Sequence, residues 1–317
     1  MSGDDDVERA GLTADGAFGA LGNLTRVEIL QTLAAADDPL TFSTLRERVG
    51  TLDSGQFAYH LGKLDGHFVH KTEDGYRLSQ HGRYLVEAIL SGVFTESPRV
   101  EPTAVDFDCL FCGTSIEVSY EDGTVQLRCP ECTFQRSEEL ADEGRPTGVL
   151  SAFAFPPAGV IGRSPAELQA AAATWVHLEA VALSSRVCPR CAAAVDLDIT
   201  ACPSHQSGDR LCETCGELRG VRLHYRCRNC IFEADLGAVM GLLAAPPLLA
   251  FIGDHGLNAT SKGFQWGWDY GEEILATSPF EARFTFDIDD ERLTLHVDDQ
   301  LEVLSASRTS IDDGRVA

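Results

Sequence analysis

The sequence predicts an α+β fold, because helical and strand-like patterns occupy different stretches of the chain. Helix caps and helical apolar spacing surround a single hairpin pattern in the first ninety residues, whereas residues 280–307 alternate apolar and polar side chains in three runs. Between these regions lie eleven cysteines, ten of them in five Cys-x2-Cys pairs. These observations predict an N-terminal helical domain, metal-binding hairpin modules and a small α+β C-terminal region.

The charge and composition of the chain argue against several classes of protein. The 317 residues carry 49 acidic and 25 basic side chains, for a net charge of −24, and only three of the bases are lysines: Lys63, Lys71 and Lys262. Taken as a whole, such a surface repels nucleic acid and anionic membranes, and we expect an adaptation to a cytoplasm of molar salt. A hydrophobic content of 44% argues against a mainly disordered chain.

Two observations predict a cytoplasmic protein that does not bind membranes. The acidic start, Asp4-Asp5-Asp6, lacks the positive charge and the apolar run of an export signal. Residues 236–253 are uncharged, but Pro246-Pro247 interrupts a run that is already shorter than the roughly 20 residues of a spanning helix. We expect two short buried helices there, over 236–244 and 247–254. The cytoplasm is reducing, so the cysteines of a cytoplasmic protein are more often metal ligands than disulfide partners.

Residues 17–92 have the element order of a winged helix-turn-helix domain. Capping residues and apolar spacing predict four helices, and two short runs around a turn at 72–74 predict a hairpin. The predicted helices begin at the caps Thr25, Thr41, Asp53 and Ser79, and the hairpin lies between the last two helices. Helix, helix, helix, hairpin, helix is the order in which such domains present their third helix to DNA.

The predicted helix over 54–64 has one face suited to reading DNA. Phe57, Leu61 and Leu64 would be buried, which leaves amide, phenol, imidazole and ammonium groups on the outer face. The predicted DNA contacts are Ser54, Gln56, Tyr59, His60 and Lys63 on this helix, with Lys71 and Arg77 of the hairpin on phosphates. Residues 40–85 carry six bases and five acids, so this stretch is locally near neutral. A winged helix used to dock a protein remains the alternative.

Three stretches of this domain resemble the ArsR-like family of winged helix regulators. They are Leu21–Leu30, Phe57–Leu64 and Tyr76–Arg83, within a resemblance that covers about 17–92. The resemblance implies a DNA-binding, usually dimeric, transcriptional regulator, and the domain arrangement resembles that of archaeal regulators with cysteine-rich C-terminal regions. Metal-sensing members place cysteines beside the recognition helix. Here the first cysteine is Cys109, so metal sensing at that place is not supported.

The first predicted zinc site, within a zinc ribbon over 107–140, uses two knuckles on either side of a hairpin. Two runs that alternate around Glu121-Asp122-Gly123 predict the hairpin. The spacing of two residues lets a tight turn aim both thiolates of a pair at one ion. The predicted ligands are Cys109, Cys112, Cys129 and Cys132.

The remaining ligands fall in residues 187–234. Seven cysteines and His205, which completes a Cys-x2-His pair with Cys202, bring the total to twelve ligands, enough for three tetrahedral sites. We favour a nested arrangement, because short loops close at a lower entropy cost. Its outer site is Cys188, Cys191, Cys227 and Cys230, and its inner site is Cys202, His205, Cys212 and Cys215. A sequential pairing of Cys188/Cys191 with Cys212/Cys215 stays open, as does His224 in place of His205.

These patterns predict a sequence-specific transcriptional regulator with up to three structural zinc ions and no catalytic residues. Its expected partners are double-stranded DNA, a second copy of the chain, and an unknown small-molecule or protein effector at the C-terminal region. A zinc-ribbon adaptor that docks on transcription or processing machinery is the alternative, and redox sensitivity of the zinc sites stays open. The remaining segments are a flexible acidic N-terminus over 1–16, a linker over 93–106, a connector with a helix over 141–186, an α+β region over 235–308 and a tail over 309–317.

Overall fold

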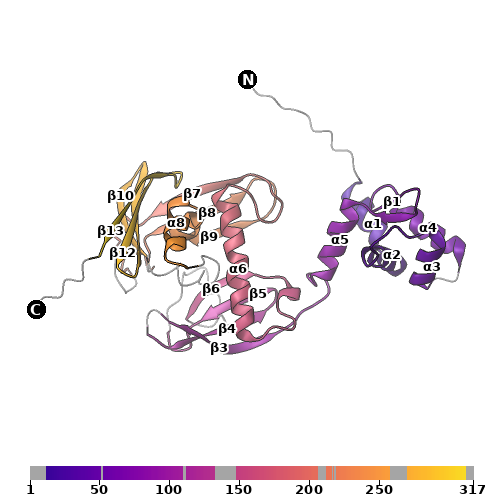
Figure 1. Cartoon of the computed structure of the whole chain (residues 1–317), viewed down its shortest axis with the longest axis horizontal. Coiled ribbons are helices and arrows are strands. Elements are labelled where there is room, and N and C mark those ends of the chain that lie inside the picture. Colours follow the sequence, from indigo (N-terminus) through magenta and orange to yellow (C-terminus); the bar gives the residue numbers. More distant parts are fainter. Residues whose placement is uncertain are drawn as a thin grey trace, which may run out of the picture. The chain divides into compact units, whose positions relative to one another are not determined.

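The computed structural model is an α+β protein, as the sequence predicts (Figure 1). It describes residues 12–50, 53–109, 112–132, 148–205, 212–215, 217, 219–257 and 270–311. The chain divides into two compact units, Met1–Glu96 and Ser97–Ala317. In the part of the chain that the structure describes, no helix combines the length and apolar character needed to cross a membrane. Residues 1–11 of the expected flexible N-terminus and 312–317 of the expected tail lie outside the described residues.

The N-terminal unit has helices around one short hairpin. Its elements are α1 (Ala14–Leu21), α2 (Leu24–Ala34), α3 (Phe42–Val49), α4 (Ser54–Leu64), β1 (Val69–Lys71), β2 (Tyr76–Leu78) and α5 (Gln80–Leu90). The strands pair antiparallel, with His70 opposite Arg77. Ile29, Leu45 and Phe57 are fully buried in one apolar core, so α2, α3 and α4 all pack against it. In α4 the buried face is the one that the apolar spacing predicts.

Side-chain caps fix most of the helix starts in this unit. Thr41, Asp53 and Ser79 accept backbone N–H bonds from Thr44, Gln56 and Gly82, respectively, which satisfies donors that the first helical turn leaves free. The prediction that Thr25 caps α2 is wrong. The helix begins at Leu24 after Asn23, which makes no capping bond, because α1 ends only two residues before it.

Helix α1 corrects the prediction of a flexible segment over 1–16. Its N-cap is Thr13, whose side chain accepts a bond from the Gly16 N–H. Two glycines, Gly16 and Gly19, lower the helical propensity of this stretch. Packing stabilises the helix instead, because Ala20 is buried in the same apolar core as residues of α2.

The C-terminal unit contains three antiparallel sheets among its described residues. The first has the order β3-β4-β5-β6, the second β7-β8-β9 and the third β10-β11-β12-β13. The strands are β3 (Val100–Asp108), β4 (Ser115–Glu121), β5 (Thr124–Arg128), β6 (Val149–Ala154), β7 (Val195–Ala201), β8 (Val221–Cys227), β9 (Glu233–Gly237), β10 (Gly271–Thr277), β11 (Phe280–Ile288), β12 (Glu291–Val297) and β13 (Val303–Ser310).

Helix α6 (Pro165–Ser184) contributes to the cores of all three sheets. Leu168 packs with the first sheet, Ala180 with the third and Leu183 with the second. Figure 1 shows this long helix running past β4–β6 toward β7–β9. The short helices α7 (Ala238–Leu242) and α8 (Pro246–Asp254) lie where the uncharged stretch predicts two helices, and both contribute to the core of the third sheet. Helix α7 is shorter than the predicted 236–244, because Leu236 and Gly237 belong to β9.

Two other boundaries differ from the sequence predictions. The predicted linker over 93–106 contains most of β3, an edge strand whose register shifts between Val100 and Thr103, on either side of Pro102. An edge strand tolerates proline where its backbone N–H would face solvent rather than a neighbouring strand. Proline and acidic residues therefore made this strand resemble a linker in the sequence. The predicted tail begins inside β13, which reaches Ser310. Strands β6 and β10 were not anticipated, and residues 133–147 of the predicted ribbon and connector lie outside the described residues.

Candidate metal centres and nucleic-acid interface

Four cysteines gather at the open end of the β4–β5 hairpin. Cys109 and Cys112 follow β3, and Cys129 and Cys132 follow β5; their four Sγ atoms lie within 4.8 Å of one another. The Sγ atoms of Cys109 and Cys132 are 3.8 Å apart, and those of Cys112 and Cys129 are 3.4 Å apart. Thiolates about 2.3 Å from a tetrahedral ion lie roughly 3.8 Å from one another, so these spacings fit a bound metal. They are too long for disulfides, whose sulfurs lie about 2.05 Å apart.

Backbone geometry shapes this first centre. The Cys109 N–H donates to Thr114 O, and the Gly113 N–H donates to Cys109 O, which closes a tight turn around the pair. On the other side, Gly148 has a positive φ of 79°, and a Cβ there would lie 2.3 Å from Cys129 O. Only glycine lets β6 approach the second knuckle so closely.

The second centre lies at one end of the β7–β8 pair. Val195 pairs with Cys227, so the antiparallel register brings the start of β7 beside the end of β8. The Sγ atoms of Cys188 and Cys230 are 3.7 Å apart, and those of Cys191 and Cys227 are 3.5 Å apart. All four lie within 4.8 Å of one another.

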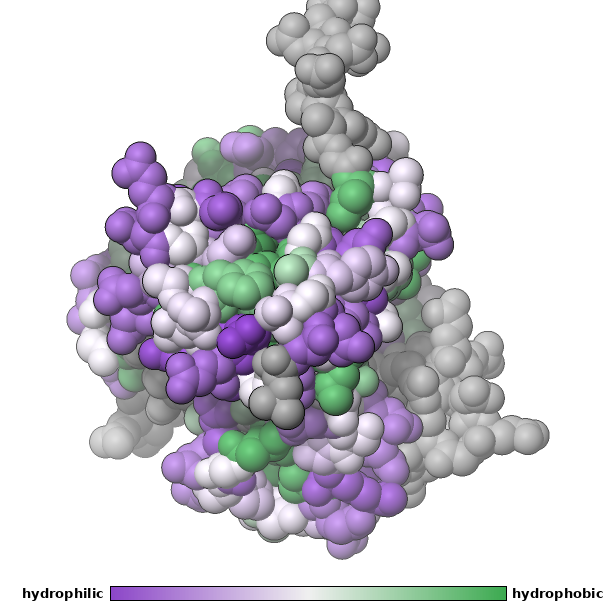
Figure 2. All heavy atoms as spheres, turned by 90° about the vertical axis from the view of Figure 1, so that its right-hand side faces the viewer, coloured by the Kyte–Doolittle hydropathy of each residue, from purple (hydrophilic) through white to green (hydrophobic). Residues whose placement is uncertain are grey.

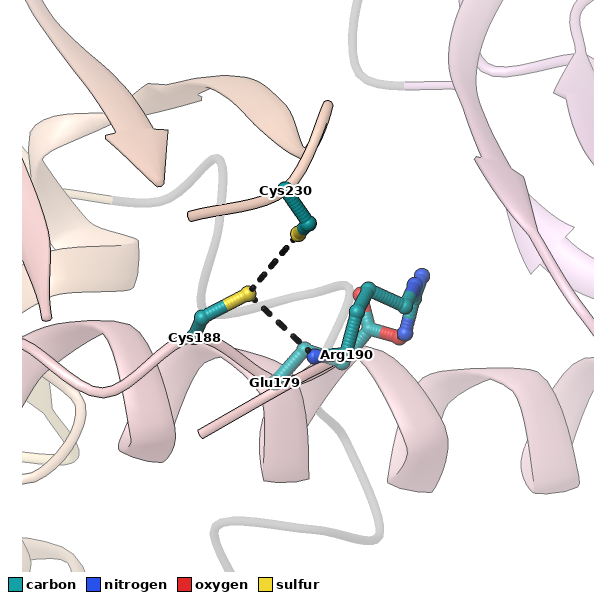
Figure 3. Close-up of polar contacts among 4 residues, drawn as sticks. All are labelled: Glu179, Cys188, Arg190 and Cys230. Carbon is teal, nitrogen blue, oxygen red and sulfur yellow. Dashed lines mark hydrogen bonds and ion pairs between the residues drawn. The ribbon is translucent and has the colours of Figure 1, made fainter. Parts of the chain in front are cut away.

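Helix α6 anchors the first knuckle of the second centre. Figure 3 shows the Arg190 backbone N–H directed at Cys188 Sγ, while the Arg190 side chain reaches Glu179 of α6. Glu179 is mostly buried, with its side chain 17% exposed. This ion pair ties the loop that carries Cys188 and Cys191 to a rigid helix.

The third centre lies at the opposite end of the same strand pair. Cys202 follows β7, Cys212 and Cys215 precede β8, and the four ligand atoms of Cys202, His205, Cys212 and Cys215 lie within 4.8 Å of one another. His205 Nδ1 is 3.5 Å from Cys215 Sγ. The structure therefore has the nested grouping, because a β-hairpin separates its two ends. His224 lies outside the group and contacts Asp235 and Thr200 instead.

Sequence reasoning missed one side chain at the third centre. Glu272 of β10 places Oε1 3.6 Å from His205 Nε2 and accepts the Gly220 N–H. Burial raises the pKa of Glu272, while the Gly220 N–H and the nearby His205 act to lower it. One sequence feature could have indicated it: Glu272 lies two positions before Ile274, so in a strand this acid shares the inward face with an apolar residue.

Hydrogen bonds favour the thiolate form at two of the ligands. Bonds from Thr114 lower the pKa of Cys112 to about 6. The backbone N–H groups of Cys230 and Asn229 lower the pKa of Cys227 to about 6. Because metals bind the thiolate rather than the thiol, these donors prepare one cysteine in each of the first two centres for a cation.

The predicted DNA contacts lie on the surface of the N-terminal unit. Ser54, Gln56, Tyr59, Lys63, Lys71 and Arg77 are exposed, and His60 is half-buried. Lys63 Nζ lies 5.5 Å from the centre of the Tyr59 ring, so the outer face of α4 is polar and aromatic. Figure 2, viewed from the side on which α3 and α4 lie in Figure 1, shows mostly hydrophilic residues with separate apolar patches.

Bases are used differently in the two units. Every ion pair found among the described residues joins side chains of the C-terminal unit. Within that same described part, Lys63, Lys71 and Arg77 pair with no carboxylate. Lys63 and Lys71 lie over the rings of Tyr59 and Tyr76 instead, so these ammonium groups have aromatic rather than anionic neighbours.

Comparison with known proteins matches two family models. Residues 106–303, more than half of the chain, match the model described as "Domain of unknown function (DUF7351)". Residues 14–89 match the model described as "Domain of unknown function (DUF7347)". No curated protein and no solved structure matches the chain.

Proposed function

We propose that this chain, which belongs to the DUF7351 family of domains of unknown function, is a sequence-specific DNA-binding regulator of transcription with structural zinc. The observation that carries the proposal is the outer face of α4. Gln56, Tyr59 and Lys63 are exposed there, and the hairpin bases Lys71 and Arg77 are exposed in the same unit. A helix with amide and ammonium groups suits base edges in a major groove, and hairpin bases suit the flanking phosphates.

The charge distribution supports the same use of this surface. In a chain of net charge −24, a surface that binds DNA must collect its bases locally, because the molecule as a whole repels phosphates. Lys63, Lys71 and Arg77 make no ion pair with another described residue, whereas arginines of the C-terminal unit such as Arg228 and Arg292 are paired. Bases that pair with no carboxylate replace counterions at phosphates without first breaking an ion pair.

Zinc is the metal that the three centres suit best. Each brings together four side chains, either four thiols or three thiols and an imidazole, and zinc takes both sets in tetrahedral geometry. A closed set of four leaves no position for a water ligand, which favours a structural over a catalytic role. Such centres hold their metal in a reducing cytoplasm, where we place the protein.

We further propose that the regulator acts as a homodimer. Large apolar side chains are exposed on α1, at the start of α2 and around α5: Phe18, Leu24, Leu90 and Phe94. They lie on elements other than α4 and the hairpin. Two copies joined there would present two α4 helices to half-sites about one helical turn apart, while the C-terminal unit contacts an effector.

Selection from a random DNA pool tests the proposal. Metal-loaded protein in molar potassium chloride should enrich an inverted repeat, because high salt suppresses binding through phosphates alone. The double variant Gln56→Ala/Lys63→Ala should lose preference for that repeat, since each base contact contributes about 1–3 kcal/mol. Gln31→Ala, on an exposed position of α2, is the matched control and should bind as the parent does. If folded protein enriches no sequence, the proposal fails in favour of a protein-docking adaptor.

A further inference from the structure

We propose that Glu272 of β10 is a positioning residue for the third metal centre, which it links to the C-terminal sheet. The inference rests on the proposal that this centre binds zinc. Glu272 orients the His205 ring so that Nδ1 faces the three thiols. Metal binding at the centre and docking of the β10–β13 sheet therefore depend on each other.

The two nitrogens of the His205 ring have different neighbours. Nδ1 is 3.5 Å from Cys215 Sγ, whereas Nε2 is 3.6 Å from Glu272 Oε1. A carboxylate beside Nε2 favours the tautomer that carries its proton there, which leaves the Nδ1 lone pair for a metal. Metal-binding histidines commonly direct their second nitrogen at a carboxylate or carbonyl in this way.

Burial makes this contact sensitive to substitution. The side chains of His205 and Glu272 are only 3% and 1% exposed, and a buried carboxylate is costly unless partners compensate the lost water. The Gly220 N–H donates to the same Oε1 atom. The cost of burying Glu272 is thus offset by the loop that carries the metal ligands, which explains why an acid occupies an inward strand position.

Gly220 connects the ligand loop to Glu272. Its carbonyl oxygen accepts the Cys202 N–H at 2.8 Å, and a Cβ at this position would lie 2.5 Å from His205 Cγ. One residue earlier, the Arg219 guanidinium lies 4.7 Å from the centre of the Tyr270 ring. Residues 219–220 therefore contact both the metal ligands and the start of β10.

The strand that leads to the metal-ligand loop and the β10–β13 sheet, which the His205–Glu272 contact joins, also share an apolar core. Ile199 and Ala201 of β7 pack against the buried cluster that contains Phe284 of β11, and Cys202 follows directly. A metal ion at the third centre would fix the loop at the end of that shared core. Loss of the ion would free His205, and with it the partner of Glu272.

Metal competition with the full-length protein tests the inference. The parent should bind three zinc ions, and Glu272→Ala should weaken one of them by about 10- to 100-fold against a chromophoric chelator, the usual effect of removing such a partner. The other two ions should be unchanged. Glu273→Gln is the matched control: this neighbouring acid is exposed and pairs with Arg283, and the variant should hold all three ions as the parent does.

Cobalt substitution shows which centre is affected. The weakened ion should be the one whose visible spectrum reports three sulfurs and one nitrogen, while the two four-sulfur spectra persist. Glu272→Gln keeps the size of the side chain without its charge, so it serves where Glu272→Ala does not fold, and it should weaken the same ion. Equal loss of all three ions, or no selective loss, would overturn the role of Glu272. A parent that binds only two ions would refute the zinc proposal for this centre and the inference with it, whereas a failed DNA selection would leave both standing.

Discussion

The two units of this chain are stabilised in different ways. In the N-terminal unit, helices close around one apolar core that includes Leu30 and Phe57, and no cysteine occurs before Cys109. The C-terminal unit divides its burial among separate apolar cores, the largest of them at the β10–β13 sheet, and its twelve predicted ligands lie at the ends of strands in the other two sheets. Isolated hairpins are marginally stable in water. The comparison predicts that one unit needs only hydrophobic burial, whereas the other depends on bound metal as well.

Metal removal should separate the two units most strongly. Structural zinc contributes about 10–16 kcal/mol of binding free energy in small modules, so a chelator should unfold the strands around the three centres. The helices of the N-terminal unit should persist, because no described metal group includes a residue before Cys109. Hydrogen exchange read residue by residue checks this. Simultaneous unfolding of both units would remove the distinction between them.

A core substitution in the N-terminal unit should destabilise that unit and leave the metal centres of the C-terminal unit intact. Phe57 is fully buried, and its ring centre lies 5.2 Å from that of Phe42. Phe57→Ala should destabilise this unit by about 3–5 kcal/mol, with the protein still binding as many metal ions as the parent. Denaturant unfolding and elemental analysis measure the two effects. Glu47→Ala, at an exposed position of α3, is the control and should change neither, and a loss of metal in Phe57→Ala would contradict independent units.

The same contrast explains which features the sequence predicts. Helices α3 and α4 begin where the sequence predicts because their starts depend on local caps at Thr41 and Asp53. The twelve metal ligands could be identified as pairs because two-residue spacing is also local, whereas the sequence left open how the last four pairs combine, which the structure decides. Strand β3 was not predicted, because it is defined by its pairing with β4. Glu272 was missed because its partner His205 is 67 positions away, and only tertiary packing brings them together.

Loss of one cap should give a smaller effect that stays within its unit. The Asp53 carboxylate accepts the Gln56 N–H at 2.6 Å at the start of α4. Asp53→Ala should cost about 1 kcal/mol, measured as a lower denaturant midpoint of the N-terminal transition alone. Asp37→Ala, an exposed acid outside any helix, serves as the control. A shift in the C-terminal transition would indicate coupling between the units.

The smallest effect should come from a buried histidine in the C-terminal unit. His177 of α6 is 6% exposed, and burial lowers its pKa. The unfolded chain therefore takes up this proton first as the pH falls below about 6.5, so stability is lost from there down through the lower pKa of the folded state. His177→Gln should reduce the acid sensitivity of the C-terminal transition between pH 7 and 5, beyond the loss from thiolate protonation that both proteins share. Identical pH profiles of the two proteins would mean that thiolate protonation and metal release alone set the acid limit of this unit.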